Sequence, residues 1–283
     1  MTIASSLRVV AWTALALGLL LWASTARAQC PMPAADFTPD PEFTSSFLLE
    51  RCKFETTGDN PFFPLRPGWQ VVLESDEGVA TVTVLDETRW VNGVRTRVVE
   101  EFEAEKDGDE LVPVERSLNF FAFCKQTGSI AYFGEEVFFF DDQGQPIPGT
   151  GGWQDGQNGA RAGLIMPGTI LVGGRYYQEI APEDSALDKG EIVALEDSCE
   201  VGGFAFGPCV EVVDTSDCDP DAEDTKRFAA GVGNVQDEDL EVVRFGFVRK
   251  SGRHRHERWG RHGDDDDERW KEARSRLGRH AGD

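Results

Sequence analysis

The sequence predicts an all-β protein, an antiparallel meander that forms a curved sheet or sandwich and carries a long glycine-rich loop. Three observations favour this class. Apolar and polar residues alternate with a period of two, as in VATVTVL at 79–85. Turn residues separate such runs at short intervals, and Asn92-Gly93 is the pair best suited to a two-residue hairpin. Helical periodicity is nearly absent before residue 251.

The N-terminus has the pattern of a secretory signal peptide. Arg8 precedes an apolar run at 9–22, and Ala26-Arg27-Ala28 then supplies the small-x-small ending of a cleavage site. Cleavage after Ala28 leaves Gln29 as the first residue. A membrane anchor is the alternative, but about fourteen apolar residues fall short of the roughly 20 that a spanning helix needs. We expect a secreted or periplasmic protein without a membrane anchor.

All six cysteines follow this cleavage point and would meet an oxidising compartment, where disulfides persist. Their even number predicts up to three disulfides, and the sequence leaves the pairing open. The absence of a C-x-x-C spacing argues against a redox motif or a zinc knuckle. The cysteines are Cys30, Cys52, Cys124, Cys199, Cys209 and Cys218.

Charge divides the mature chain into an acidic body and a balanced tail. Residues 29–250 contain 17 Lys plus Arg against 43 Asp plus Glu, a net charge of −26, whereas residues 251–283 contain 9 against 8. So acidic a body repels phosphate backbones, which excludes nucleic acid as an expected partner. It attracts cations or basic partners, although solubility alone also explains such a charge.

Four strands joined by short turns form the predicted meander. The first begins at Val79 and ends at the Asn92-Gly93 turn, and the next three are 94–105, 111–124 and 130–140. Further short strands are expected at 175–180, 191–195, 210–213 and 240–248.

Aromatic residues dominate the third and fourth strands of this meander. Alternation places Phe121 and Phe123 on one face and Phe120 on the other, so both faces need cover. A curved sheet or sandwich provides this cover better than a flat open sheet.

A long segment at 141–168, rich in glycine and proline, follows the meander, and we expect no strand within it. Connections of this length are usually functional or disordered. Because Trp153 and its apolar neighbours would otherwise face water, we expect an ordered loop folded back onto the sheet. Trp153, Asp155, Asn158 and Arg161 are its candidate ligand-binding residues. In the alternative, structural interpretation, Trp153 packs on the sheet and Arg161 pairs with a carboxylate such as that of Asp155.

Several motifs occur in an order that resembles a family of secreted bacterial β-rich proteins. They are NPFFPLRPG at 60–68, YFGEE at 132–136, GGWQDGQNGARAGLIMP at 151–167, YYQE at 176–179 and AGVGNV at 230–235. The resemblance covers about residues 60–248 and implies a single β-rich secreted domain, but it carries no activity, ligand or catalytic residue. Cys124 and the tail after Lys250 depart from the family pattern.

Histidine is missing from the predicted domain. His254, His256, His262 and His280 all lie in the tail, which excludes imidazole-based triads and the usual zinc hydrolase sites from the body. An enzyme built on two carboxylates is still possible. Glu135, Glu136, Glu179 and Asp155 are candidates for a glycosidase acid and base, with Trp153 or Tyr177 stacked on the sugar.

Acidic residues alternate at Asp217, Asp219 and Asp221, which imitates the start of a calcium loop. Ala222 replaces the glycine that an EF-hand requires, so this class of loop is excluded. A looser calcium site and a solvated turn are the two remaining interpretations. No other cofactor is expected.

The tail at 251–283 mixes both charges and contains Leu277 as its only Leu, Ile, Val or Phe. We expect this segment to be disordered, because it cannot bury enough apolar surface to offset the entropy of ordering. The predicted organisation is therefore a signal peptide at 1–28, a β-rich domain at 29–250 and a tail at 251–283.

Together these features favour a secreted, noncatalytic binding or interaction module of unknown ligand, with a glycan or a cation as possible partners. The loop at 153–161 and the neighbouring Glu135, Tyr177 and Glu179 are the residues expected to face that ligand. The alternative hypothesis is a carboxylate-dependent glycan hydrolase.

Overall fold

A computed structural model describes residues 30–108 and 110–248 of the chain. The predicted signal peptide and tail lie outside these residues. Within them the fold is all-β, as predicted, and the 3-10 turn at Leu49–Arg51 is the one helical element described. No described helix is long and apolar enough to cross a membrane.

The strands follow one another along the chain as β1 (Phe54–Glu55), β2 (Gly58–Asp59), β3 (Pro64–Leu65), β4 (Trp69–Glu74), β5 (Gly78–Val91), β6 (Val94–Asp107), β7 (Glu110–Cys124), β8 (Ile130–Phe140), β9 (Pro146–Gly151), β10 (Arg161–Met166), β11 (Arg175–Tyr177), β12 (Glu179–Ile180), β13 (Asp188–Glu196), β14 (Cys199–Val201), β15 (Phe204–Phe206), β16 (Cys209–Ser216), β17 (Glu223–Ala229), β18 (Gly233–Asp237) and β19 (Leu240–Phe247). A 15-stranded antiparallel sheet has the order β11-β13-β16-β17-β18-β19-β4-β5-β6-β7-β8-β10-β12, with β1 beside β7 and β9 beside β8. The pairs β2-β3 and β14-β15 form two small sheets.

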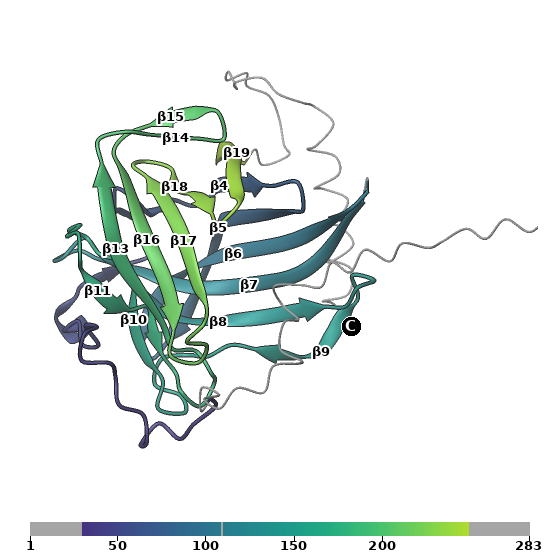
Figure 1. Ribbon diagram of the computed structural model, residues 1–283. Coiled ribbons are helices and arrows are strands. Elements are labelled where there is room, and N and C mark those ends of the chain that lie inside the picture. The colour runs from purple at the N-terminus through teal and green to yellow at the C-terminus, as the bar shows by residue number, and fades with distance from the viewer. Residues whose placement is uncertain (1–29, 109, 249–283) are drawn as a thin grey trace, which may run out of the picture.

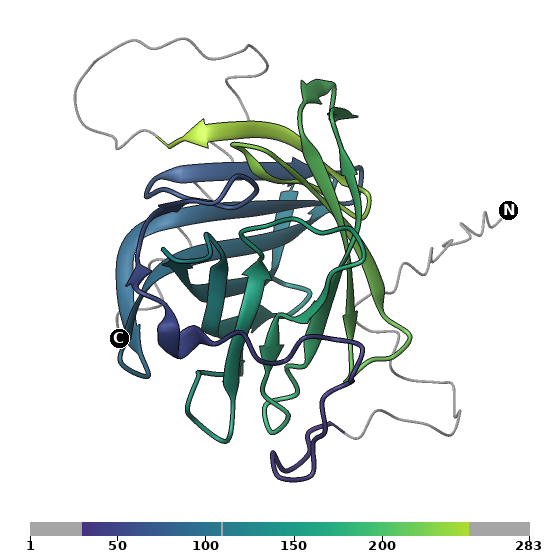
Figure 2. The same cartoon turned by 90° about the vertical axis from the view of Figure 1, so that its left-hand side faces the viewer.

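The large sheet closes on itself. β11 and β12 stand at opposite ends of the strand order, yet only Gln178 separates them in the chain. β11 pairs with β13 and β12 pairs with β10, so this one segment joins the two edges of the sheet. Figure 1 and Figure 2 show the strands surrounding a single interior. The predicted curvature therefore takes the form of a nearly closed barrel.

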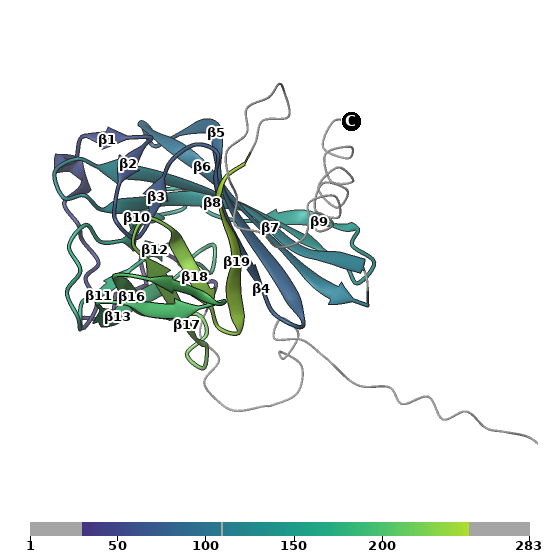
Figure 3. The same ribbon diagram turned by 90° about the horizontal axis from the view of Figure 1, so that it is seen from above.

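The predicted meander is confirmed as β5, β6, β7 and β8, which are neighbours in chain order. Asn92 and Gly93 have φ angles of 44° and 80° at the β5–β6 turn, as a hairpin turn with two positive φ values requires. The ends of these strands at the β6–β7 turn project, together with β9, beyond β16 and β17 (Figure 3).

The glycine-rich segment at 141–168 contains two strands, β9 and β10, so the expectation of a strandless connection was wrong. Glycine allows these strands to pair closely with their neighbours in the sheet. A Cβ at Gly163 in β10 would lie 2.4 Å from the carbonyl oxygens of both Tyr177 and Gln178. Only residues 152–160 form a loop between these strands, and this loop is ordered on the sheet, as predicted.

The register identifies the inner face of the barrel. Residues directly opposite in antiparallel strands share a face, which places Val82, Glu101 and Ser117 in one row. Val99, two residues before Glu101, shares that face and is buried in the same cluster as Val210 of β16. Because β6 and β16 are far apart in the strand order, these side chains meet across the interior.

Three disulfides join all six cysteines and confirm the predicted number of bridges. They fasten the segment before β1 to the barrel at two places and close the β14–β15 hairpin. The pairs are Cys30–Cys218, Cys52–Cys124 and Cys199–Cys209.

Candidate functional site

Carboxylates from distant strands meet inside the barrel. Burial and the neighbouring charge of Glu103 raise the pKa of Glu101 in β6 to about 7. Lys226 in β17, Asp237 in β18 and Glu135 in β8 also influence that pKa. The strand order places β17 and β18 on the other side of the barrel from β6, so the interior brings these groups together.

Lys226 is the cation that the structure places among these acids. Its Nζ lies 3.4 Å from Asp214 Oδ2 and 3.5 Å from Asp237 Oδ2. Burial lowers the pKa of Lys226, but the charges of Asp237, Asp214 and Glu101 outweigh burial and hold it well above its ordinary value. Lys226 therefore stays charged and is shared between two carboxylates.

Access to solvent decreases along the inner face. Glu103 and Asp188 are exposed, Glu101 and Glu115 are half-buried, and Glu179 is 3% exposed. Glu103 is nevertheless surrounded by protein on the inner face of the barrel. The reduced solvation and the charge of Glu115 raise the pKa of Glu103 to about 7. Burial and the charge of Glu101 do the same for Glu115. Protons therefore compensate part of the negative charge near neutral pH.

Tyr132 connects the deep residues into a hydrogen-bond network. Its Oη lies 2.6 Å from Asn119 Oδ1 and 2.7 Å from Glu135 Oε2. A phenol has one proton to donate, so it satisfies one of these two acceptors. Burial raises the pKa of Glu135, although the hydrogen bond that Tyr132 can donate to Glu135 Oε2 lowers it. Asn119 in turn donates Nδ2 to Ser117 Oγ at 3.0 Å.

Three buried polar atoms beside this network have no hydrogen-bond partner among the described residues. They are Trp153 Nε1, Tyr176 Oη and Glu179 Oε2, on side chains that are 3%, 4% and 3% exposed. A buried polar group without a partner costs about 1–3 kcal/mol, and folded proteins rarely leave one unexplained. Their location next to one carboxylate cluster makes the interior the candidate site.

Local geometry fixes each of these three groups. The Trp153 ring packs edge-on against Tyr132 at 5.2 Å, and the backbone N–H of Glu135 donates to Trp153 O at 2.9 Å. This approach needs Gly134, which has φ 143° and where a Cβ would lie 2.4 Å from Trp153 O.

Tyr176 and Glu179 belong to the segment that closes the barrel. A Cβ at Gly190, which is opposite Asp214, would lie 3.0 Å from Tyr176 Oη, so the hydroxyl lies over that glycine. Burial and the charge of Asp214 raise the pKa of Tyr176, which keeps its phenol neutral and able to donate. Burial and the charge of Asp188 hold the pKa of Glu179 well above its ordinary value.

Of the seven ligand-binding candidates from the sequence, Glu135, Trp153 and Glu179 converge on this interior. Both glutamates raise the pKa of Tyr132, after burial, and Trp153 packs on the Tyr132 ring. Trp153 is thus buried inside the barrel and does not form a stacking platform on the surface.

The other four candidates lie elsewhere. Asp155 accepts from Asn92 Nδ2 and from the Ala162 N–H, both at 2.8 Å, and so stabilises the loop without pairing with Arg161. Asn158 and Arg161 are exposed. Tyr177 faces outward, where its hydroxyl donates to Asp217 and accepts from the Asp40 N–H at 2.8 Å.

The sequence interpretation missed Glu101, Tyr132, Tyr176 and Lys226. The pattern EFEAE at 101–105 does mark a polar face. The sequence assigns no partner to this face, and only closure of the barrel turns it inward.

The structure does not assemble the calcium site considered at Asp217, Asp219 and Asp221. Asp217 forms an ion pair with Lys189 and accepts from the Tyr177 hydroxyl, whereas the other two are exposed in a turn. Across residues 30–108 and 110–248, no group of three or more His, Cys, Asp or Glu is arranged to hold a metal ion.

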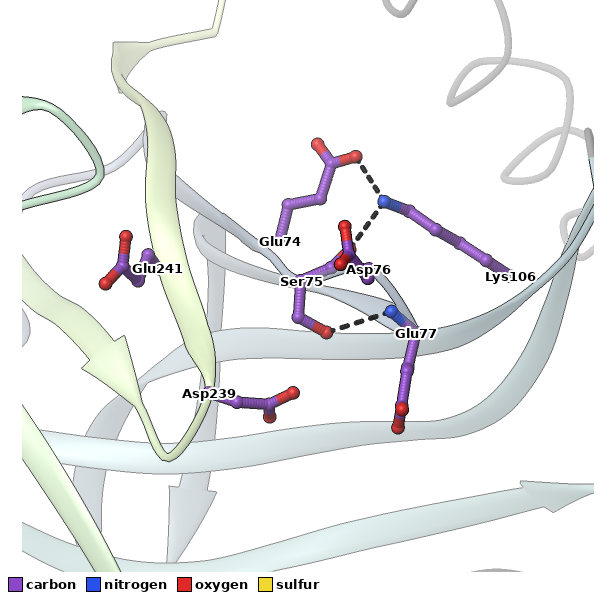
Figure 4. A pocket seen from close by; sticks show the side chains of 7 residues that line it. All are labelled: Glu74, Ser75, Asp76, Glu77, Lys106, Asp239 and Glu241. Atoms are coloured by element: carbon purple, nitrogen blue, oxygen red, sulfur yellow. Dashed lines mark hydrogen bonds and ion pairs between the residues drawn. The ribbon is translucent and has the colours of Figure 1, made fainter. Parts of the chain in front are cut away.

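An open surface cavity of about 520 Å³ lies between the β4–β5 and β18–β19 turns. Figure 4 shows that its carboxylates point in different directions and do not share one centre. Lys106 Nζ already donates to Glu74 Oε1 at 2.5 Å and to Ser75 O at 2.6 Å. This groove is less convincing than the interior as a binding site.

No family model, no curated protein and no solved structure matches the chain.

Proposed function

We propose that the protein is a noncatalytic binding module that holds a small molecule inside its barrel. The observation that carries this proposal is the set of buried, unpartnered atoms Trp153 Nε1, Tyr176 Oη and Glu179 Oε2 beside one carboxylate cluster. A bound molecule that completes these hydrogen bonds would recover the cost of leaving them unpaired.

The acidic interior supports the same proposal. Carboxylates in a low-dielectric interior reduce stability unless they are paired, and titratable groups with strongly shifted pKa values concentrate at functional sites. Barrels of about eight strands are either filled by side chains or hold one small ligand, and the sheet of this protein has more strands than that.

Export to the periplasm or the medium is part of this proposal. The three disulfides indicate an oxidising compartment, and the signal-peptide pattern at 1–28 indicates the route.

Thermal unfolding with a small panel of probes tests the proposal. The panel combines amines (glucosamine, ethanolamine), neutral polyols (glucose, glycerol) and anions (gluconate, glycerol phosphate). A probe at about 100 times its Kd adds about 2.7 kcal/mol, which raises Tm by several degrees in a domain of this size. We expect at least one probe to do this in the wild type and to lose the effect in Glu179→Gln.

A panel with no stabilising member, or stabilisation that Glu179→Gln leaves unchanged, would contradict a site in the interior. Glu135 and Glu179 are also the two carboxyl groups that a glycoside hydrolase would need. Aryl glycosides are therefore included. If the wild type hydrolyses an aryl glycoside and both Glu135→Gln and Glu179→Gln abolish this turnover, the protein is a glycoside hydrolase and the proposed noncatalytic function is wrong.

A further inference from the structure

The groups that line the interior restrict the chemistry of what it can hold. Resting on the proposed function, we propose that the interior takes a compact organic cation that also carries oxygen acceptors, a class that includes amino sugars and amino alcohols.

The charge balance requires the cation. Lys226 is already shared between Asp214 and Asp237. The inner face carries further carboxyl groups that act on one another across the barrel, and within residues 30–108 and 110–248 no second cation lies among them. The ionised members of this set would repel an anionic ligand, whereas an ammonium group would be attracted to them and would favour the ionised form of the others. These carboxyl groups are Glu101, Glu103, Glu115, Glu135, Glu179 and Asp188.

The unpartnered donors require the oxygen. Trp153 Nε1–H can only donate a hydrogen bond, and the Tyr176 phenol is neutral and carries a free proton. An ammonium group has no lone pair to accept either bond. A ligand that satisfies both sides of the site therefore needs hydroxyl or carbonyl oxygens in addition to its charge.

Binding of the ammonium group and donation to the ligand oxygens fall to groups at different positions in the interior. Glu179 Oε2 has no partner at hydrogen-bond distance and lies near Asp188 and Glu135, and an ammonium group bound there would favour the ionised form of Glu179. Trp153 and Tyr176 approach the same network from the loop before β10 and from β11. Because all three unpartnered groups are 3–4% exposed, a compact molecule reaches them more readily than a polymer.

Isothermal titration at pH 7.5 compares glucosamine with glucose, which differs by a hydroxyl in place of the ammonium. We expect glucosamine to bind at least about tenfold more tightly than glucose, because a hydrogen bond to a charged group is worth about 1.5–3 kcal/mol. Tyr176→Phe and Glu179→Gln should each weaken glucosamine binding by about tenfold or more.

Two control variants lie on the outer face. Tyr177→Phe is the neighbour of Tyr176, and Glu100→Gln removes a carboxylate that pairs with Arg116 at 2.8 Å. Both controls should bind glucosamine as the wild type does. Tyr176→Phe removes a hydroxyl that has no partner, so its Tm should not fall, and lost binding cannot be attributed to unfolding.

Each other outcome overturns a defined part of the reasoning. If glucose binds as tightly as glucosamine and Tyr176→Phe weakens both, the interior site stands and the cationic class is wrong. If glucosamine binds equally to wild type, Tyr176→Phe and Glu179→Gln, it binds elsewhere and this inference fails. If gluconate alone stabilises the protein through Glu179, the binding function stands and the inferred charge is reversed.

Discussion

Replacing Glu101 by glutamine should make the protein more stable at pH 8 and leave its stability at pH 5 nearly unchanged. Burial and the charge of Glu103 raise the pKa of Glu101 from 4.5 to about 7, so the native state binds this proton more tightly than the unfolded chain does. The stabilisation from protonation is complete below about pH 4.5 and disappears as the pH rises through about 7. Glutamine resembles the protonated carboxyl group at every pH, so the variant should avoid that loss.

The size of the effect follows from the same pKa values. One pKa unit corresponds to about 1.4 kcal/mol, so a rise from 4.5 to about 7 sets an upper limit of roughly 3 kcal/mol. Glu101 is half-buried and shares its protonation with Glu103, and solvent screening reduces the net gain to about 1–2 kcal/mol. For a domain of this size we expect Tm at pH 8 to rise by about 3 °C or more.

Urea unfolding at pH 5 and pH 8, with the disulfides intact, measures this prediction. Glu100→Gln is the matched control, because Glu100 is the adjacent residue on the opposite face and forms an ion pair with Arg116. The control should be less stable than the wild type at pH 8. The reasoning is refuted if Glu101→Gln is less stable than the wild type at pH 8, or if wild-type stability does not fall between pH 5 and pH 8.

Three further predictions concern the loop, the chain ends and the cysteines. Trp153→Ala should reduce stability by about 3–5 kcal/mol because the indole is buried, and a cost under about 1 kcal/mol in urea would mean that the ring is exposed. Removing residues 251–283 should shift Tm of the β domain by less than about 5 °C, and a larger drop in calorimetry would show that this segment packs on the barrel. Exported protein should begin at Gln29 and show no free thiol on alkylation without reductant, which intact mass measures; retention of residues 1–28 would be inconsistent with the signal peptide.

Local pattern was sufficient to predict the strands of the meander but not the barrel. Alternation and the Asn92-Gly93 turn depend on neighbours in sequence, and β5 to β8 lie where they were expected. The closure through Gln178 depends on pairing between β11 and β13 and between β10 and β12, which no local pattern encodes. β9 and β10 were missed because glycine and proline usually disfavour strands, whereas Gly163 is needed for close contact with the backbone of Tyr177 and Gln178.

The sequence likewise predicted the site residues that belong to short local motifs and missed those whose role depends on distant strands. Glu135, Glu179 and Trp153 stood out because acids and an aromatic occur in conspicuous short motifs. Tyr132 and Lys226 did not stand out, because their significance comes from partners on strands across the barrel. One signal was available. The β6–β7 hairpin places Glu103 directly opposite Glu115, and like charges in that position are unfavourable unless another feature compensates for them.

The distribution of cations distinguishes two explanations of the acidic body. Solubility requires charge only on the outer surface, and there the acids form cross-strand pairs with arginine, as in Glu100–Arg116 at 2.8 Å and Glu211–Arg227 at 2.9 Å. Most carboxyl groups of the inner face are buried or half-buried and contribute little to solubility, yet they outnumber Lys226, the one lysine that lies among them in the described residues. Inward acids lower stability near neutral pH, so selection for stability alone would have replaced them with amides. Their presence is explained if they attract a cation into the barrel, and this is why the stabilising substitution Glu101→Gln should also weaken glucosamine binding.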